Sequence, residues 1–465
     1  MLNKRSALLL LLVLVISPIV ARADAIDDYF KLTMQKRRIP GLALAVVKNG
    51  VVVKAQGYGI ANLETDTPVK PETVFELASI TKQFTATAIM MLVEEGRVGL
   101  DDKVSKFLKE TPESWKDITV RHLLTHTSGL PGLGKDFKGL VWTFRVSTAE
   151  MYDAARRDPV EFTPGDRWQY SDVGYFLLGM IIESASGRKY SEFLTEKIFK
   201  PLEMTATTVL NQRAIIKNRA RGYTLYNDEL INLRRDAQVE LPSHYGIFST
   251  VLDLAKWDAA LYSEKLLKQS SLALMWTPVT LNNGRSSPYG FGWEVNEQRG
   301  HRIIGHTGIT GTEITRFPND SLTIIVLTNL GSYGIPETAS VNSWRMTTKV
   351  AGFYISDLPY QPIADREPEF TSIIKDMHVR PIEESWNKDL FAPEYWAELK
   401  NALTGIGGFL KSFGPLQSLV LVERKQNGED QLYRYRMVYK DNSLIISVAR
   451  NKAGKIVNLS PQAEL

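Results

Sequence analysis

The sequence predicts an α+β protein with a second, small α+β domain at its C-terminus. Within residues 24–355 a hairpin signal comes first, helical patterns follow and strand-like runs come last, so the two kinds of element are segregated rather than alternating. Three prolines mark residues 356–369 as a linker, and residues 370–465 contain a helical pattern and strand-like runs. We therefore expect one large domain followed by a small one.

Residues 1–23 are predicted to be a signal peptide. Lys4 and Arg5 precede an apolar run from Ala7 to Val20, and Ala21-Arg-Ala23 is a small-x-small cleavage pattern. The apolar run is short for a membrane span, and an uncleaved N-terminal anchor is the alternative. We expect a periplasmic or secreted protein if the source is bacterial, with no membrane span after cleavage.

Composition excludes some kinds of chemistry. The chain has no cysteine, which excludes disulfides, thiolate chemistry and lipid attachment through an N-terminal cysteine. Its formal net charge of +4 falls to +1 when Lys4, Arg5 and Arg22 leave with the signal peptide. Without a basic block, the sequence gives no support for nucleic-acid binding.

The main domain is predicted to start with a short helix at about residues 25–36 and a hairpin. Asn49-Gly50 separates the runs 42–47 and 51–57, and Asn-Gly between such runs favours a two-residue turn. From Ser79 an apolar helical pattern is predicted to stop at Gly96, and a helical stretch is then predicted to run on to Ser128-Gly129, where a helix breaks. A second apolar helix is predicted at residues 176–184, closed by Gly187.

Strands are predicted on both sides of the linker. Those of the main domain lie at residues 289–295, 312–317 and 322–329, with a turn at Pro318-Asn-Asp320. In the tail we predict a helix at residues 393–403 and an antiparallel meander at residues 417–423, 431–439, 443–450 and 455–459. No residue of the tail is predicted to be catalytic.

Ser79 and Lys82 are the central candidate site. Residues at i and i+3 share a helix face, so the serine hydroxyl can lie within reach of the lysine amine. A neutral amine can take the proton of serine as the oxygen attacks a carbonyl, and burial favours that neutral form. S-x-x-K also begins at serines 186, 372 and 385 and is most often a solvated helix face, but the match at Ser79 leads into an apolar helical pattern.

Tyr170 and His306 lie in the two other informative stretches. Tyr170-Ser-Asp172 follows a Pro-Gly turn, where a phenol can point into a cleft, although a half-buried aromatic is the commoner role. The second stretch is His306-Thr307-Gly308-Ile309. A His-Thr-Gly sequence most often marks a strand end, and its glycine lets another backbone or a substrate approach an edge strand closely.

His122 and His126 are four residues apart and could share a helix face. Without a nearby third ligand or an H-E-x-x-H pattern, two histidines make a poor zinc site. We expect them to have a packing role.

Together these stretches resemble a known family. Ser79-Ile-Thr-Lys82, Tyr170-Ser-Asp172 and His306-Thr-Gly308 are similar, in that order, to the S-x-x-K, Y-x-N and K-T-G motifs of the serine β-lactamase and penicillin-binding-protein superfamily. The stretches RHLLTHTSGL (121–130) and PGDRWQYS (164–171) resemble its class C-like branch, which includes class C β-lactamases, D-aminopeptidases, DD-carboxypeptidases and esterases. The resemblance covers about residues 25–355.

The resemblance implies a β-lactamase-like fold, an antiparallel sheet made from both ends of the domain and flanked by helices, with an inserted helical region. It implies that Ser79 attacks, Lys82 accepts its proton and Tyr170 relays a proton to the leaving group. The backbone N–H groups of Ser79 and Ile309, the latter on an edge strand, would bind the oxyanion. The remaining implied site residues contact substrate: Asp172, His306, Thr307 and Gly308. The substrate would be a small molecule or peptide, including one derived from the cell wall, and no metal or organic cofactor is needed.

Two residues depart from the motifs. Asp172 stands where asparagine is usual, and its charge would raise the pKa of Lys82 or, as a hypothesis, bind a substrate amine. His306 replaces lysine, so a fixed charge becomes one that is expected to titrate near neutrality. Both changes argue against an efficient β-lactamase and favour hydrolysis of esters, amides or D-amino-acid peptides. The alternative is a non-turnover penicillin-binding or sensor-type protein with the same fold.

Overall fold

The computed structural model describes residues 25–132, 145–211, 213–233, 238–331, 344–379, 386–400, 403, 413–440 and 443–463. The predicted signal peptide lies outside the described residues. The chain forms two compact units, of which the first ends at Ile355 and the second begins at Ser356.

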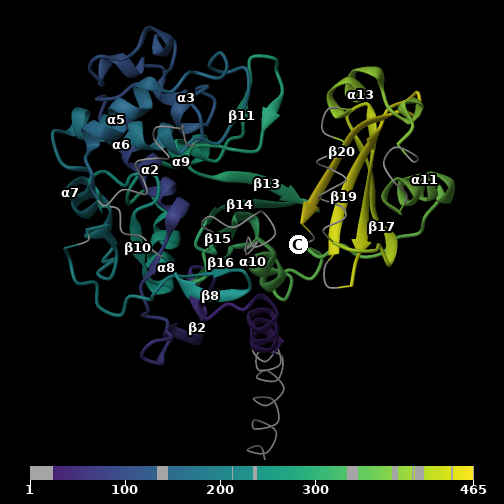
Figure 1. Ribbon diagram of the computed structural model, residues 1–465, viewed down its shortest axis with the longest axis horizontal. Coiled ribbons are helices and arrows are strands. Elements are labelled where there is room, and N and C mark those ends of the chain that lie inside the picture. Colours follow the sequence, from purple (N-terminus) through teal and green to yellow (C-terminus); the bar gives the residue numbers. More distant parts are fainter. Residues whose placement is uncertain are drawn as a thin grey trace, which may run out of the picture. The chain divides into compact units, whose positions relative to one another are not determined.

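A seven-stranded antiparallel sheet is the centre of the first unit (Figure 1). Strand β16 pairs with β1, so both ends of the unit build one sheet, and this prediction is confirmed. In sheet order the strands are β13 (Glu294–Gln298), β14 (His301–Gly308), β15 (Thr312–Phe317), β16 (Leu322–Thr328), β1 (Gly41–Lys48), β2 (Val51–Asn62) and β3 (Thr67–Pro68).

The predicted hairpin is present between β1 and β2. Asn49 and Gly50 have φ values of +52° and +74°, which is the backbone that a type I′ turn requires at both central positions. The turn pairs Lys48 with Val51 and thereby sets the register of both strands. Residues 25–37 before the hairpin are helical, close to the predicted range.

Helices α8 (Val251–Ala260) and α10 (Trp344–Ala351) pack on opposite faces of this sheet. Arg316 of β15 donates to Asp258 of α8 at 2.6 Å. The neighbouring Thr315 contacts Thr347 of α10 at 2.8 Å. Because consecutive strand residues point to opposite faces, the two helices cover different sides.

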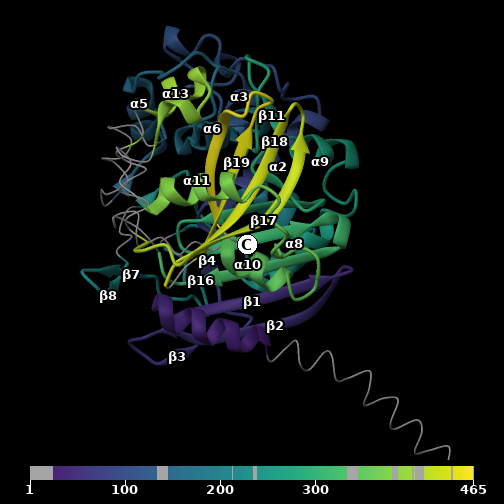
Figure 2. The same cartoon turned by 90° about the vertical axis from the view of Figure 1, so that its right-hand side faces the viewer.

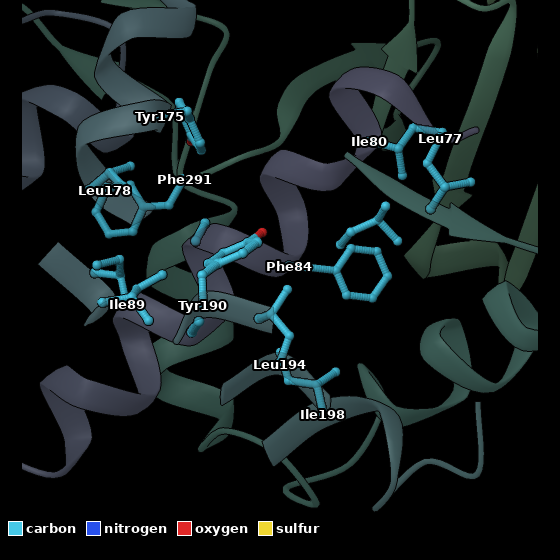
Figure 3. Packing of buried hydrophobic residues seen from close by; sticks show 14 of the residues in the cluster. Leu77, Ile80, Phe84, Ile89, Tyr175, Leu178, Tyr190, Leu194, Ile198 and Phe291 are labelled. Carbon is cyan, nitrogen blue, oxygen red and sulfur yellow. The ribbon is translucent and has the colours of Figure 1, made fainter. Parts of the chain in front are cut away.

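Helix α2 (Thr81–Glu94), which follows Ser79, is the central helix of the unit. Every residue from Thr81 to Leu92 is buried, as expected of a helix that is apolar on most sides. Phe84 stacks on Trp257 with ring centres 4.2 Å apart. Figure 3 shows Phe84 and Ile89 among side chains of α6 (Asp172–Ser186) and α7 (Tyr190–Leu194).

The predicted helix stop at Gly96 is confirmed, whereas the helical stretch predicted from there to residue 128 is wrong for most of its length. The helix ends at Glu94, and Gly96 turns the chain with φ +70°. Residues 95–119 contain only the short 3-10 turns η2 (Val104–Lys106) and η3 (Glu113–Trp115) before α3 (Val120–Leu124). The Gly99 N–H donates to the Asp102 carboxylate at 2.6 Å, a local turn that competes with helix.

Two other boundaries differ from prediction. The strand predicted at residues 289–295 begins at Glu294, because Gly292 has φ +76° and the Phe291 N–H bonds to Met275 instead of a strand. Helix α6 starts at Asp172, earlier than predicted, and is closed by Gly187 at φ +70° as expected.

Shorter elements complete the first unit. They are β4 (Phe75–Glu76), β5 (Arg145–Val146), α5 (Thr148–Arg157), β6 (Thr208–Val209), β7 (Tyr223–Tyr226), β8 (Glu229–Asn232), β9 (Gln238–Val239), β10 (Ile247–Ser249), α9 (Gln269–Met275), β11 (Val279–Thr280) and β12 (Ser286–Ser287). Strand β10 lies between β4 and β6 and thereby borders the start of the Ser79 turn.

The second unit is the predicted small α+β domain (Figure 2). Its strands form an antiparallel meander in chain order: β17 (Ser418–Asn427), β18 (Asp430–Val438), β19 (Ser443–Arg450) and β20 (Ile456–Ala463). Helices α11 (Pro368–Val379) and α13 (Pro393–Leu399) contribute Phe370, Ile374 and Leu399 to a core with Tyr435 and Ile446. The sequence did not predict α11, whose start Pro368 fell within the predicted linker although proline favours a first helical position.

Candidate active site

Ser79 lies in a 3-10 turn, η1 (Ala78–Ile80), that leads directly into α2. Ala78 has a left-handed backbone at φ +48°, which costs a non-glycine residue about 1–3 kcal/mol and needs support from its surroundings. Thr310 and Thr312 supply it, because their hydroxyls donate to the backbone oxygens of residues 76 and 77 at 2.9 Å. The turn that carries Ser79 is thus held by residues 234 and 235 positions further along the chain.

Lys82 makes three hydrogen bonds although its side chain is 0% exposed. Its Nζ donates to Ser79 Oγ at 3.1 Å, to Asp172 Oδ1 at 2.7 Å and to the backbone oxygen of His244 at 2.8 Å. An ammonium group uses all its hydrogens in these bonds. A neutral amine can keep the bonds to Asp172 and His244 and turn its lone pair toward the Ser79 hydroxyl.

Burial and Asp172 act on Lys82 in opposite directions. Burial lowers the pKa of Lys82, while the charge and hydrogen bond of Asp172 raise it, and the net effect is a lowered pKa. The predicted effect of Asp172 is therefore present but smaller than that of burial. Burial alone would raise the pKa of Asp172, but mainly the charge of Lys82 holds it below its usual value. Position N1 of α6 also favours a carboxylate there.

Tyr170 brings its phenol to this pair. Lys82 Nζ lies 4.8 Å from the centre of the Tyr170 ring. Burial raises the pKa of Tyr170 well above its usual value, the charge of Asp172 adds to the rise, and the Ser79 hydroxyl opposes it. The phenol oxygen is buried next to Ser79, but it makes no hydrogen bond of normal geometry to any residue that the structure describes. Tyr170 therefore presents a protonated phenol next to the Ser79 hydroxyl.

Strand β14 reaches the same turn through Gly308. A β-carbon on Gly308 would lie 2.5 Å from the backbone oxygen of Leu77, so glycine is required for this approach. Ile309 follows directly and is 45% exposed. The prediction that this is an edge strand is wrong for most of β14, because β13 pairs with residues 301–305. Residues 306–308 continue past that pairing, next to the Ser79 turn.

His306 does not titrate near neutrality as predicted. Its Nδ1 lies 2.7 Å from the backbone oxygen of Thr307, and its Nε2 lies 2.9 Å from the Tyr289 hydroxyl. Because a carbonyl oxygen only accepts, Nδ1 carries the proton and Nε2 accepts from the phenol. Burial and the nearby charge of Lys82 lower the pKa of His306 to about 3. The position that holds lysine in the K-T-G motif is uncharged here at neutral pH.

His122 and His126 do not share a helix face. His122 lies on α3, where its Nδ1 accepts the Thr119 N–H at 3.2 Å as part of a capping box. His126 lies beyond the end of α3 with a left-handed backbone, φ +60°. Its ring is buried, with its centre 4.3 Å from that of Tyr170. The expected packing role is therefore found for His126 beside a candidate catalytic residue.

Sequence reasoning did not find His244, Tyr289 or Trp168. His244 contributes a backbone oxygen, which leaves no signal in residue type. Tyr289 bonds His306 from a segment predicted to be strand. Trp168 is 39% exposed and its ring centre lies 6.0 Å from that of Tyr289. The signal available in the sequence was a tryptophan two residues before Tyr170, within a mostly polar stretch.

The part of the chain that the structure describes contains no group of three or more histidine, aspartate or glutamate side chains arranged to hold a metal ion. Among the same residues, no helix is both long enough and apolar enough to cross a membrane.

Comparison with known proteins identifies several that are similar to this chain. The family model described as Beta-lactamase matches residues 26–338. Penicillin-binding protein 4* of Bacillus subtilis is 34% identical over 330 residues, which cover 65% of this chain and 71% of that protein. The octameric penicillin-binding protein homologue from Pyrococcus abyssi has a TM-score of 0.62 and 25% identity, with 95% of this chain and 98% of that chain covered. D-amino acid amidase from Ochrobactrum anthropi SV3 has a TM-score of 0.62 and 26% identity over 72% of this chain and 99% of its own.

Proposed function

The chain belongs to the beta-lactamase family, and on that premise we propose that it is a serine hydrolase that forms an acyl-enzyme on Ser79. The observation that carries the proposal is the 3.1 Å contact between Ser79 Oγ and the fully buried Nζ of Lys82. Burial favours the neutral amine that a lysine base needs. The proposed substrates are esters, amides or D-amino-acid peptides, including peptides derived from the cell wall.

In the proposed reaction Ser79 Oγ attacks the carbonyl carbon while its proton moves to the neutral Lys82 amine. The backbone N–H groups of Ser79 and Ile309 bind the oxyanion. When the tetrahedral intermediate collapses, Tyr170 gives its O–H proton to the leaving group and regains one from the Lys82 ammonium. The raised pKa of Tyr170 supports this role, because a phenol that stays protonated can act as a proton donor. Water then attacks the acyl-enzyme. The proton of the water passes through Lys82 and Tyr170 to Ser79 Oγ, which leaves as the acid product is released.

We propose that the part of the substrate beside His306 is neutral. His306 has a pKa of about 3, so it offers no charge to a substrate carboxylate at neutral pH. Trp168 and Ile309, 39% and 45% exposed, offer apolar surface near the site. These features favour apolar esters and amides over β-lactams, which carry a carboxylate. The ion pair of Asp172 with Lys82 weighs against the hypothesis that Asp172 binds a substrate amine.

A non-turnover penicillin-binding protein is the second candidate, favoured by one observation. Lys82 can donate all three ammonium hydrogens, one of them to the Asp172 carboxylate, and this stabilises the form that cannot act as a base. Because Lys82 is also the base of the acylation step, such a protein would be acylated slowly and would likewise release product very slowly.

Labelling and turnover together test the proposal. A fluorophosphonate or a fluorescent penicillin should label the wild type but not Ser79→Ala, and a panel of p-nitrophenyl esters, D-amino-acid amides and a chromogenic cephalosporin should show turnover of neutral esters or amides. Labelling that survives Ser79→Ala would eliminate Ser79 as nucleophile. Labelling without turnover of any substrate would favour the non-turnover protein.

We also propose that residues 1–23 direct export to the periplasm or medium. The supporting feature is the charged start, apolar run and small-x-small pattern of the sequence. N-terminal sequencing of the protein recovered from its host should find a start near Asp24. Recovery of the uncut chain in membranes would support the anchor alternative.

A further inference from the structure

We infer that His126 is a positioning residue that fixes Tyr170 for proton transfer. The inference rests on the proposed function of Tyr170. The backbone oxygen of His126 accepts the N–H of Gln169 at 2.9 Å, and its ring Nδ1 accepts the N–H of Ser171 at 3.0 Å. These two bonds bracket Tyr170, so a single residue sets the backbone on both sides of the phenol.

The His126 ring also confines the Tyr170 side chain. The two ring centres are 4.3 Å apart with 37° between the planes. Tyr289 and Tyr175 pack on the same imidazole at 4.6 Å and 5.0 Å. Several rings therefore hold the His126 side chain in place, and its direct contact with Tyr170 fixes the position of the phenol ring.

The bond to Ser171 also fixes where α6 begins. The Ser171 hydroxyl accepts the Gly174 N–H at 3.1 Å as the helix cap and donates to the backbone oxygen of Pro131 at 2.8 Å. The Asp172 N–H bonds to the backbone oxygen of Gly132 at 2.9 Å. Segment 126–132 thus serves as a template that places Tyr170 and Asp172 together.

Histidine suits this position for two reasons. Its Nδ1 accepts a hydrogen bond only while unprotonated, and burial, aided by the charge of Lys82, keeps the pKa of His126 well below its usual value. Its backbone has φ +60°, a conformation in which histidine and asparagine are found more often than most residues. Both features keep the acceptor in place at neutral pH.

The test compares two esters of one apolar acid that differ in their leaving group. A p-nitrophenolate leaves without help, whereas an alkoxide must be protonated as it leaves. His126→Gly tolerates the left-handed backbone but removes both the acceptor and the ring, so kcat/KM should fall about 100-fold on the alkyl ester and less than about tenfold on the p-nitrophenyl ester. Tyr170→Phe should show the same selectivity.

Two further variants serve as controls. His126→Asn keeps an oxygen acceptor where Nδ1 lies and should retain kcat/KM on the alkyl ester to within about tenfold. His122→Ala removes a histidine of α3 that bonds to Thr119 and not to Tyr170, and it should leave the ratio of the two esters unchanged. If His126→Gly fails to fold by circular dichroism, His126→Gln takes its place, because it has no acceptor at the Nδ1 position.

The outcomes separate the inference from its premise. If Tyr170→Phe loses the same factor on both esters, the proton-donor role of Tyr170 is wrong. If Tyr170→Phe is selective and the folded His126→Gly, or His126→Gln in its place, is not, the positioning role of His126 is overturned. Selective loss in both, with partial retention in His126→Asn, supports it.

Discussion

Replacing Asp172 by asparagine should make Lys82 a base at lower pH. The change removes a negative charge but keeps an oxygen acceptor, now 2.7 Å from Lys82 Nζ. At that distance a pair of unit charges interacts by about 6 kcal/mol with an effective dielectric constant of about 20 and by about 1.5 kcal/mol in water. The Asp172 side chain is 23% exposed, so the lost interaction lies between these limits. Burial then lowers the pKa of Lys82 with less opposition.

The assay is kcat/KM against pH on an uncharged p-nitrophenyl ester. Activity requires neutral Lys82, so it rises as pH rises through the pKa of that residue, and the acid limb of the variant should lie at lower pH. A change of about 1.4 kcal/mol is tenfold in a protonation equilibrium. At a pH well below both acid limbs, the fraction of plateau activity that the variant retains should therefore be at least about ten times the fraction that the wild type retains.

An acid limb that stays in place, or that moves to higher pH, would refute the reasoning that Lys82 is the base and that Asp172 holds its proton. Asp101→Asn is the matched control, because Asp101 pairs with Arg121 on the surface and should not move the limb.

The other predictions concern stability and the fit of β14. The folded pKa of His306, about 3, lies below its usual 6.5, so the stability that comes from its neutral ring is fully present above pH 6.5. As pH falls toward 3, the free energy of unfolding should lose up to about 5 kcal/mol of this stability. The urea midpoint of His306→Gln should therefore fall less over that range than the midpoint of the wild type. Gly308→Ala should slow fluorophosphonate labelling about 100-fold, because its methyl would meet a backbone oxygen of the turn that carries Ser79 at 2.5 Å. Gly174→Ala, with its nearest contact at 3.6 Å, should not slow labelling. Asp258→Ala should cost about 3–5 kcal/mol in urea unfolding, because it leaves the Arg316 guanidinium buried without its carboxylate.

Each of these has a clear contrary result. If the urea midpoint of His306→Gln falls as steeply with decreasing pH as that of the wild type, the His306 ring is not the titrating group. Gly308→Ala that labels as fast as Gly174→Ala would show that the contact relaxes at no cost. Asp258→Ala that costs no more than Asp101→Ala, in an exposed pair, would show that Arg316 finds water or another acceptor.

Local signals were sufficient for much of the fold. Asn49-Gly50 predicted the hairpin because only a few residue types accept two positive φ values in succession. The meander of the second unit followed from period-two alternation between turn residues. The spacing of Ser79 and Lys82 predicted their contact, since η1 leads directly into α2 and this continuous helical turn fixes the contact locally.

Features that depend on distant neighbours were not predictable. The sequence around His306 suggests an exposed strand end, and its burial arises only when Tyr289 and β13 pack beside it. His126 looked like the next turn of the helix that carries His122, but that helix stops at Leu124. The acceptor provided by His244 is a backbone oxygen, which no residue type could reveal.

The burial of Lys82 determines when Ser79 becomes reactive as the chain folds. The acceptors of Lys82 lie 3, 90 and 162 residues away in sequence, so the amine is enclosed only after α2, α6 and the segment at His244 have come together. Before that, the lysine is solvated and charged, and the serine beside it is an ordinary alcohol. An electrophilic probe should therefore not label nascent or partly denatured chains. The rate at which refolding samples become labelled would measure the rate at which these distant segments assemble around Lys82.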